Sequence, residues 1–154
     1  MALYFGARAP ILQGMATPRP YCNLIARLKA AALRPTRQRL ALARLLFEHG
    51  NRHLTAEQLH GEAAAAQVPV SLATVYNTLH QFTAAGLLRE VVVEPGRSYF
   101  DTNVDDHHHF FHEDSGRLED IAGDEVRLVD LPVPPKGKHI RRVDIIIRLH
   151  GDEK

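Results

Sequence analysis

Residues 71–85 read SLATVYNTLHQFTAA and predict a helix with two unlike faces. A 3-4-3 spacing places four apolar side chains on one face, toward a core: Leu72, Val75, Leu79 and Phe82. The opposite face has no charge and carries short side chains that form hydrogen bonds: Thr74, Asn77, Thr78 and Gln81. Asn and Gln can read adenine edges and Thr can contact thymine methyl groups, so this face suits the major groove of DNA. The plainer alternative is a polar surface helix.

Three segments before this stretch also have the pattern of helices, at about residues 21–33, 37–49 and 55–66. Thr36 and Ser71 are placed to cap the second and the last helix. Thr55 and Gln58 fit a capping box at the start of the third. Residues 21–85 are therefore expected to be mostly helical.

A β-hairpin is expected next, with strands at residues 88–93 and 97–101 joined by Glu94-Pro95-Gly96. Helices closed by a hairpin with a basic residue near its tip indicate a winged helix-turn-helix. In that fold the second helix of the motif enters the major groove and the wing lies along the DNA backbone. The expected domain spans residues 21–103 and follows a flexible arm at residues 1–20.

Positive charge is concentrated in the same half of the chain. Residues 1–104 hold 11 Lys and Arg against 6 Asp and Glu, a net +5, whereas residues 105–154 hold 8 against 12, a net −4. Arg37 and Arg39 fall in the first turn of a helix, where cations oppose the helix dipole. Such a placement is often tolerated because it serves binding. The front half is therefore expected to bind an anionic partner, double-stranded DNA.

The second informative stretch is residues 105–114, DDHHHFFHED, with four of the ten histidines and four carboxylates. Imidazole and carboxylate are ligands that suit zinc, iron and manganese. In an extended strand the side chains alternate, so His107 and His109 share one face and His108 takes the other. Residues i and i+2 lie about 6.6 Å apart, close enough for both imidazoles to reach one ion. The alternative is a solvated surface strand.

The remaining residues, 104–154, are expected to form a small α/β domain for dimerisation and for sensing metal or heme. Its predicted elements are strands at 107–112, 117–121 and 140–149, a weak helix or strand at 124–131 and a rigid linker at 132–135. Ile145-Ile146-Ile147 is apolar on both faces, which favours a central strand or one paired across an interface. About 50 residues make a thin core, so a homodimer or a larger assembly is expected.

The composition excludes several kinds of site. A single cysteine, Cys22, rules out an internal disulfide and a structural four-cysteine zinc site within one chain, and it favours a reducing cytoplasm. No apolar run approaches the length of a membrane span, so no membrane partner is expected. The opening residues are interrupted by Arg8 and Pro10 and make a poor signal peptide, and the true start is Met1 or Met15.

Six motifs in this order resemble the ferric uptake regulator (Fur) superfamily over residues 24–149, most closely its iron response regulator (Irr) branch. They are LRPTRQR (33–39), RHLTAEQL (52–59), VPVSLATVYNTL (68–79), AGLL (85–88), YFDTN (99–103) and HHHFF (107–111). The resemblance implies an α/β (α+β) fold, with an N-terminal winged helix-turn-helix followed by a small α/β dimerisation domain. It implies a DNA-binding transcriptional regulator of iron or heme homeostasis, not an enzyme, that binds an A/T-rich palindromic operator as a dimer.

The resemblance also implies which residues contact DNA. Bases would be contacted by the helix face that holds Ser71, Thr74, Tyr76 and Asn77. The minor groove would receive Arg34, and phosphates would be held by Arg37 and Arg39. Asn77 stands where Fur itself commonly has Arg, which implies a different operator. The alternative for Tyr76 is a packing residue at the flank of the helix.

For metal, the resemblance implies an inter-domain site with these ligands: His53, Asp101, His107, His109 and Asp120. Such a site would tie the third helix, the exit of the wing and the first C-terminal strand together, so occupancy could set the angle between the domains. A second metal or heme site would use His108, with Asp106, Glu125 and Asp144 as the best positional matches for its partners. The expected cofactor is a divalent metal (Fe, Mn or Zn), heme, or both.

Two departures from the family pattern concern cysteine. Fur proteins often carry paired Cys-x-x-Cys motifs for zinc, whereas the positions of the first pair here are His112 and Ser115. Some Irr proteins carry a heme motif built on Cys-Pro, whereas Cys22 is followed by Asn23. The motif is therefore absent, and a response to heme would depend on residues 107–109.

Several readings of the histidine run stay open. Heme accepts axial imidazole, and Phe110 and Phe111 could pack against a porphyrin, although two aromatics are more often core residues. A peroxide-sensing repressor or one that responds to manganese or zinc would use the same ligands. A zinc-dependent hydrolase belongs to another class and would need a general base, for which Glu113 is the only adjacent residue.

Overall fold

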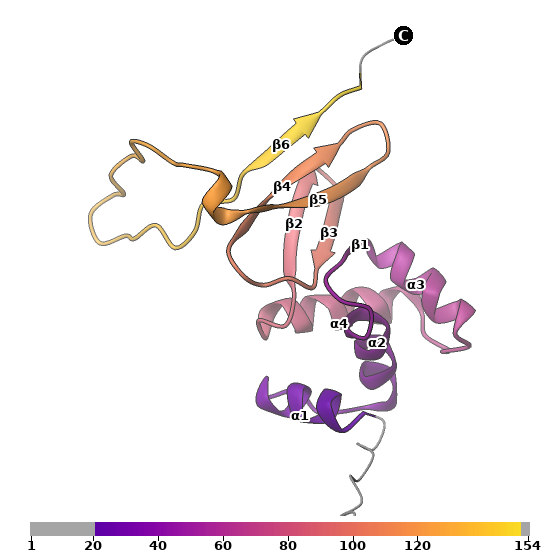
Figure 1. Ribbon diagram of the computed structural model, residues 1–154. Coiled ribbons are helices and arrows are strands. Elements are labelled where there is room, and N and C mark those ends of the chain that lie inside the picture. The colour runs from indigo at the N-terminus through magenta and orange to yellow at the C-terminus, as the bar shows by residue number, and fades with distance from the viewer. Residues whose placement is uncertain (1–20, 152–154) are drawn as a thin grey trace, which may run out of the picture.

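The computed structural model describes residues 21–151, and Figure 1 shows its helices gathered at one end and its sheets at the other. The helices are α1 (Cys22–Ala30), α2 (Arg37–Phe47), α3 (Ala56–Ala65), α4 (Leu72–Ala84) and the short 3-10 helix η1 (Gly123–Glu125). The strands are β1 (His53–Leu54), β2 (Arg89–Glu94), β3 (Arg97–Asp101), β4 (His107–His112), β5 (Arg117–Ala122) and β6 (Ile146–Leu149). The predicted arm at residues 1–20 lies outside the described residues. All four predicted helices and both predicted hairpins are present.

Side-chain caps fix where three of these helices begin. Thr36 Oγ1 accepts the backbone N–H three residues further along at 3.2 Å, and Ser71 Oγ accepts its counterpart at 3.1 Å. The capping box is complete, because Thr55 Oγ1 accepts the N–H of Gln58 while Gln58 Oε1 accepts the N–H of Thr55. Each cap satisfies a backbone donor that a helix terminus leaves without a partner. The predicted helix starts are therefore confirmed.

The helices pack around one apolar core, which takes buried side chains from all four of them. Leu28, Leu46, Leu59 and Phe82 contribute one from each helix, and Phe100 of β3 joins the same core. Loss of such a buried side chain typically destabilises a domain by several kcal/mol, roughly 2–5 for Leu to Ala. This core holds α4 against the start of the first sheet.

Helix α4 differs from its prediction at Thr78. This residue was expected on the outer face, but it is only 5% exposed. It shares a stripe with Val75, Leu79 and Phe82, which are completely buried, because positions three and four apart lie on the same side of a helix. The exposed stripe of α4 instead consists of Ala73, Tyr76, Asn77, His80, Gln81 and Ala84.

The first sheet has the strand order β1-β3-β2, and its neighbours are antiparallel. Strand β1 was not predicted, because two residues between helices are too short for an alternating pattern. It pairs His53 with Asp101, while β2 pairs Arg89 with Asp101 from the other side. The central strand thus presents Asp101 between these two residues.

The second sheet has the order β5-β4-β6, with β4 antiparallel to β5 and parallel to β6. The strand predicted at 140–149 is correct only over Ile146–Leu149. It lies at the edge of the sheet and not at its centre, and its pairing across an interface stays a prediction. The weak element predicted at 124–131 reduces to η1, and residues 126–145 form a loop without helix or strand that projects from the body (Figure 1). Of this loop, only Ile145 bonds to β4 in the described chain, where its carbonyl accepts the His109 N–H at 3.0 Å.

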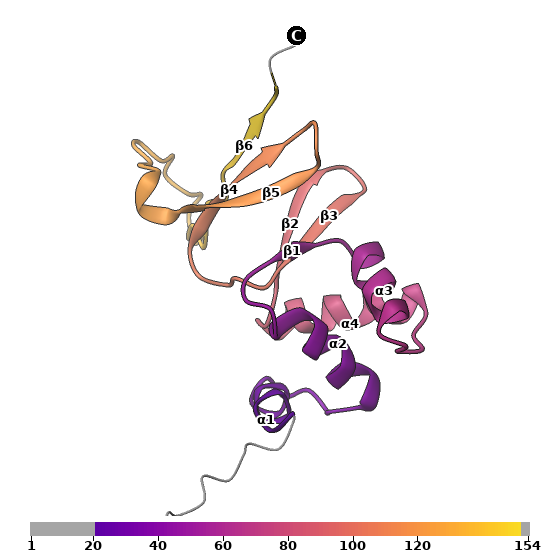
Figure 2. The same cartoon turned by 45° about the vertical axis from the view of Figure 1, so that its right-hand side comes forward.

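The two sheets lie side by side (Figure 2), and a second apolar cluster joins them. Its buried members are Val91, Val93, Tyr99, Phe111 and Leu118. Arg97, the basic residue near the tip of the wing (the β2–β3 hairpin), is exposed. Its guanidinium carbon lies 5.7 Å from the Tyr99 ring and 5.8 Å from the Phe111 ring, within the range of cation–π attraction. In this structure the wing is packed against the second sheet.

Candidate metal centre

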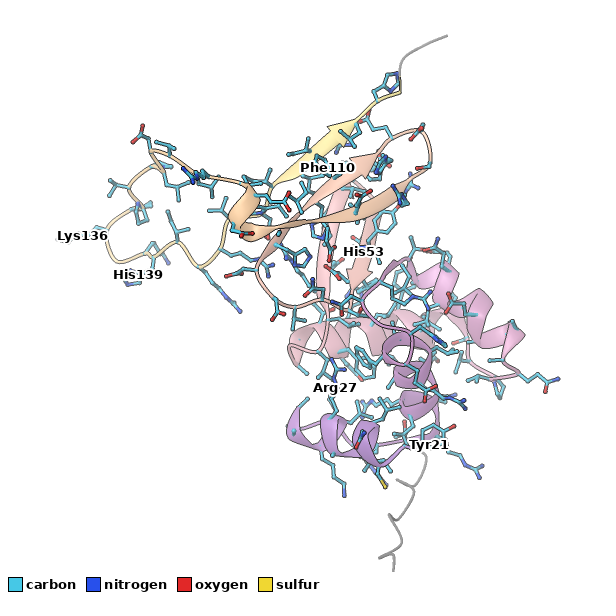
Figure 3. All side chains as sticks on the ribbon, viewed as in Figure 1. Tyr21, Arg27, His53, Phe110, Lys136 and His139 are labelled. Carbon is cyan, nitrogen blue, oxygen red and sulfur yellow. The ribbon has the colours of Figure 1, made fainter. Side chains whose placement is uncertain are left out.

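Five side chains that can ligate a metal converge between the two sheets: His53, Asp101, His107, His109 and Asp120. We call this group the His/Asp cluster. One ligand atom of each residue lies within 4.8 Å of those of the other four. Figure 3 shows His53 at the junction between the helices and the sheets. The structure therefore brings together all five residues expected at the inter-domain site.

Strand register accounts for this convergence. The β1–β3 pairing puts His53 beside Asp101, and the β4–β5 pairing puts His109 beside Asp120. Because side chains alternate along β4, His107 points to the same side as His109. The ring centroids of these two histidines lie 4.6 Å apart. The predicted alternation of the histidine run is thus reproduced.

The ligand atoms crowd around one point. The Nε2 atoms of His107 and His109 lie 3.0 Å apart, and they lie 2.8 and 3.3 Å from Asp101 Oδ2. His53 Nε2 is 2.8 Å from Asp120 Oδ1 and 3.4 Å from Asp101 Oδ2. Ligands about 2.1 Å from one ion lie roughly 3–4 Å from one another. The cluster therefore needs only a small contraction to surround a cation.

Burial makes a cation favourable at this place. Asp101 is completely buried and His109 is 1% exposed, whereas a third of the Asp120 side chain faces solvent. A buried carboxylate is costly unless a positive partner or several hydrogen bonds compensate it. A divalent cation among three imidazoles and two carboxylates supplies that compensation. The donor set and its burial thus fit a divalent metal.

Groups around the cluster orient its ligands. The Asn103 backbone N–H donates to Asp101 Oδ1 at 2.8 Å, and its side-chain amide donates to Asp120 Oδ2 at 2.9 Å. His107 Nδ1 lies 2.7 Å from the carbonyl oxygen of Asp105. A proton on Nδ1 that bonds to this carbonyl leaves Nε2 with a lone pair directed at the cluster.

The cluster shifts the pKa values of two of its members. Burial alone would raise the pKa of the Asp101 carboxyl, but hydrogen bonds from His109, His53 and the Asn103 backbone hold it well below its usual range. Burial alone would lower the pKa of His53, but the hydrogen bond and charge of Asp101, followed by those of Asp120, raise it overall. The two carboxylates therefore favour positive charge on His53, as they would favour a cation among the ligands.

This competition predicts how metal affinity depends on pH. A metal must displace the proton from His53, whose pKa lies above the usual 6.5, so affinity should fall as the pH drops through that raised pKa. The expected fall is about tenfold per pH unit for each proton displaced. Isothermal titration with Mn(II) across the range from about pH 8 to pH 6 measures it. Equal Mn(II) affinity throughout that range would contradict the prediction. The control is His49→Ala, which removes an exposed histidine outside the cluster and should leave the pH dependence of Mn(II) affinity unchanged.

Of the four residues predicted for a second site, only His108 and Asp106 line one pocket. This pocket has a volume of about 310 Å³, and its other lining residues include Arg141 and Arg142. Asp144 is paired with Arg89 and, at 2.7 Å, with Arg142, so basic side chains engage its carboxylate. Within residues 21–151 the His/Asp cluster is the one group of three or more such ligands. The expected set thus fails to form because arginines take its carboxylate.

The predicted DNA residues lie along α4 and the start of α2. Arg34, Arg37 and Ser71 are exposed, and a polar hollow between the two helices is lined by Thr36, Gln38, Arg39, Thr74, Asn77, Thr78 and Gln81. Arg39 is already engaged, because its guanidinium donates to the Arg34 carbonyl at 2.9 Å and to Gln81 Oε1 at 2.6 Å. Arg39 therefore fixes α2 against α4 in this structure.

Sequence reasoning missed two polar residues at these places. Arg89 is 7% exposed and donates to the His107 carbonyl at 3.1 Å. Glu57 accepts the hydroxyl of Tyr76 at 2.6 Å. Neither belongs to a motif of ligands, and only the unusual position of Arg89 in an apolar strand could have identified it.

In the described part of the chain no helix is long and apolar enough to span a membrane.

Comparison with known proteins gives consistent matches. The sequence model of the ferric uptake regulator family matches residues 30–147. A ferric uptake regulation protein of Legionella pneumophila is 30% identical over 125 residues, which are 80% of this chain and 91% of that protein. Its counterpart in Escherichia coli K12 is 34% identical over 100 residues, covering 64% of this chain and 68% of that protein.

Solved structures agree with the sequence matches. The ferric uptake regulator of Pseudomonas aeruginosa with manganese superposes with a TM-score of 0.64 at 25% identity, over 83% of this chain and 97% of that one. The regulator of Vibrio cholerae gives a TM-score of 0.65 at 23% identity, over 83% and 99% of the two chains. The second match shows that the two chains share a fold.

Proposed function

The chain belongs to the ferric uptake regulator family, and from that premise we propose that it is a homodimeric cytoplasmic transcription regulator of iron or heme homeostasis that a divalent metal controls. Members of this family are metal-responsive, DNA-binding transcription regulators and not enzymes, so a zinc hydrolase is excluded. The finer statements, about the effector, the operator and the assembly, rest on the residues of this chain.

One observation carries the proposal: the His/Asp cluster takes its ligands from both sheets. His53 and Asp101 belong to the sheet that follows the helices, whereas His107, His109 and Asp120 belong to the second sheet. A bound ion would therefore connect the proposed DNA-binding domain, residues 21–103, to the proposed dimerisation domain, residues 104–154. Metal occupancy could then set the angle of the DNA-binding half relative to the rest.

The geometry of the cluster favours a metal ion over heme. His107 and His109 are 5% and 1% exposed, and Phe111 is buried against Tyr99 and Leu118. A porphyrin would have to displace this packing to reach either imidazole. Three imidazoles and two carboxylates instead suit Fe(II), Mn(II) or Zn(II). Five donors exceed the four of a structural zinc site, and the Pseudomonas relative was solved with manganese, so Fe(II) or Mn(II) is favoured.

The second sheet supports assembly into dimers. Strand β6 lies at the edge of this sheet. The loop that precedes it, residues 126–145, exposes five apolar side chains: Leu128, Val129, Leu131, Val133 and Ile140. Figure 3 shows Lys136 and His139 on the loop that carries these residues away from the body. An uncovered edge and an apolar segment are what a second copy of the chain would cover.

The proposed Irr-like role rests on three features of the sequence. The histidine run is uninterrupted at 107–109, His112 and Ser115 replace the first cysteine pair, and Asn77 lies on the exposed stripe of α4. Because this chain lacks the two cysteines of that pair, the His/Asp cluster is the metal-binding group in the described residues. An A/T-rich palindromic operator would be read by Asn77 and its neighbours.

Binding to DNA is tested by its dependence on salt. Wild-type affinity for a pool of A/T-rich duplexes should fall steeply with salt, and Arg37→Ala should reduce the slope by about 1. The reason is that Arg37 is exposed at the start of α2, where it can neutralise one phosphate. Fluorescence anisotropy across a salt series, with and without Mn(II), measures both effects.

The matched control is Arg117→Ala, which removes an equally exposed arginine from β5, away from α2 and α4. Its slope should equal that of the wild type. A wild-type affinity that does not change with salt would contradict DNA binding, and an affinity that ignores Mn(II) would contradict control by metal.

A further inference from the structure

The exposed stripe of α4 carries one hydroxyl whose proton already has an acceptor. Tyr76 is 37% exposed, and its hydroxyl donates to Glu57 Oε1 at 2.6 Å. Glu57 lies in the first turn of α3, the helix that precedes α4. The two helices therefore share a hydrogen bond at the surface proposed to face the bases.

The Tyr76 ring is also held from the other side. Its ring stacks on His80 with centroids 6.2 Å apart and planes at 23°. His80 in turn meets the fully buried Phe100 edge to face, with centroids 5.6 Å apart. With Glu57 at its hydroxyl and His80 at its face, the phenol has a fixed position before any DNA binds.

The charge states fit this bond. The hydrogen bond with Tyr76 lowers the pKa of Glu57, and the same bond raises the pKa of Tyr76. At neutral pH the carboxylate is therefore ionised and accepts, while the phenol keeps its proton and donates. The bond is charge-assisted, a class roughly twice as strong as bonds between neutral groups.

We propose that Glu57 is a positioning residue that makes Tyr76 a reader of hydrogen-bond donors and methyl groups on DNA bases. The inference rests on the DNA-binding function proposed above. A phenol has one donor and lone pairs that accept. With the donor committed to Glu57, Tyr76 presents to DNA only the lone pairs of its oxygen and the apolar edge of its ring.

Because the Tyr76 oxygen can then only accept a hydrogen bond, Tyr76 should distinguish among the four bases. In the major groove adenine and cytosine present amino donors, thymine presents a methyl group, and the guanine edge presents only the acceptors N7 and O6. Tyr76 can accept from the first two and contact the third through its ring. Against guanine, and equally against a phosphate, its oxygen would face another acceptor. Guanine should therefore be disfavoured at the base that Tyr76 contacts.

Three substitutions test the contributions of the Glu57 side chain, its charge and the Tyr76 hydroxyl separately. Glu57→Ala frees the Tyr76 hydroxyl to donate, whereas Glu57→Gln retains an oxygen that accepts it and removes only the charge. Tyr76→Phe removes the hydroxyl and keeps the ring. Each full-length protein is loaded with Mn(II) and equilibrated with a pool of duplexes whose central segment is randomised, and the bound fraction is sequenced.

The wild type should deplete guanine by about three- to tenfold at one position of each half-site, the range of one hydrogen bond. Glu57→Ala should restore guanine there. Glu57→Gln should keep the wild-type base preference and bind all sequences more tightly, because a negative charge leaves the DNA face. Tyr76→Phe should lose the preference for adenine and cytosine over guanine and keep thymine.

Two results would overturn different statements. If Glu57→Ala, with an unfolding temperature close to that of the wild type, depletes guanine as the wild type does, the role of Glu57 is wrong and DNA binding stands. If the wild type enriches no sequence at any position, sequence-specific DNA binding itself fails. Unaltered base preferences in Tyr76→Phe would also overturn the inference, because Tyr76 would then read no amino group.

Discussion

Replacing His107 and His109 together with alanine is expected to weaken Mn(II) binding by more than about 100-fold, because loss of an outer partner alone commonly reduces metal affinity 10- to 100-fold. The two Nε2 atoms lie within 3.3 Å of Asp101 Oδ2, so the double substitution removes two of the five converging donors. Isothermal titration of the metal-free protein with Mn(II), Fe(II) and Zn(II) measures the loss. Metal-stimulated DNA binding should disappear with it.

The matched control is His108→Ala, which removes the histidine between them from the opposite face of β4. His108 is also buried, at 9% exposure, so its removal likewise truncates a buried imidazole of the same strand. Only the double variant should lose the metal. Titration of both variants with heme distinguishes heme from metal as the effector. An unchanged Soret shift in the double variant would place heme away from His107 and His109. An unchanged Mn(II) affinity of the double variant would contradict the proposed metal centre.

Phe111→Ala is expected to destabilise the protein by about 3–5 kcal/mol, the range for loss of a buried Phe. Phe111 is 3% exposed, and its ring lies 6.3 Å from that of Tyr99 in an edge-to-face arrangement. The guanidinium groups of Arg97 and Arg148 lie 5.8 and 5.5 Å from its centroid. Removing the ring takes away one of the packing contacts between the wing and the second sheet.

Unfolding in urea measures the loss, and Phe110→Ala is its control. Phe110 occupies the next position of β4 and is only partly buried, so its removal should have the smaller effect, about 1 kcal/mol. Equal losses for the two variants would contradict the packing of the wing on the second sheet. Because the wing leads directly to Asp101, Phe111→Ala should also weaken the effect of Mn(II) on DNA affinity.

The elements with strong local signals were predictable. Thr36, Thr55 and Ser71 cap the helices they were expected to cap, and a side chain can do this without help from distant residues. The period of two along β4 separates His107 and His109 from His108 for a similarly local reason. The five ligands of the His/Asp cluster came from the family resemblance, since nothing local connects His53 with residue 120.

Predictions failed where long-range packing decided the outcome. Thr78 is small and polar, and the choice between the two faces of α4 depended on the neighbouring helices, whose packing buries it. The segment 140–149 forms a strand only where it pairs with β4. The second set of ligands fails because Arg89, which is 55 residues from Asp144 in the chain, pairs with that carboxylate.

The sequence by itself determined the helices, their starting points, the alternation of the histidine run and the membership in a family of regulators. These depend on interactions within a few residues or on the order of motifs along the chain. The tertiary structure alone decided that His53 and Asp101 share a register with Arg89, that the wing rests on the second sheet, and that Glu57 takes the proton of Tyr76. Strand register and helix packing bring together groups that are 19 to 48 residues apart, and no local pattern encodes such distances because they follow from how the whole chain buries its apolar surface.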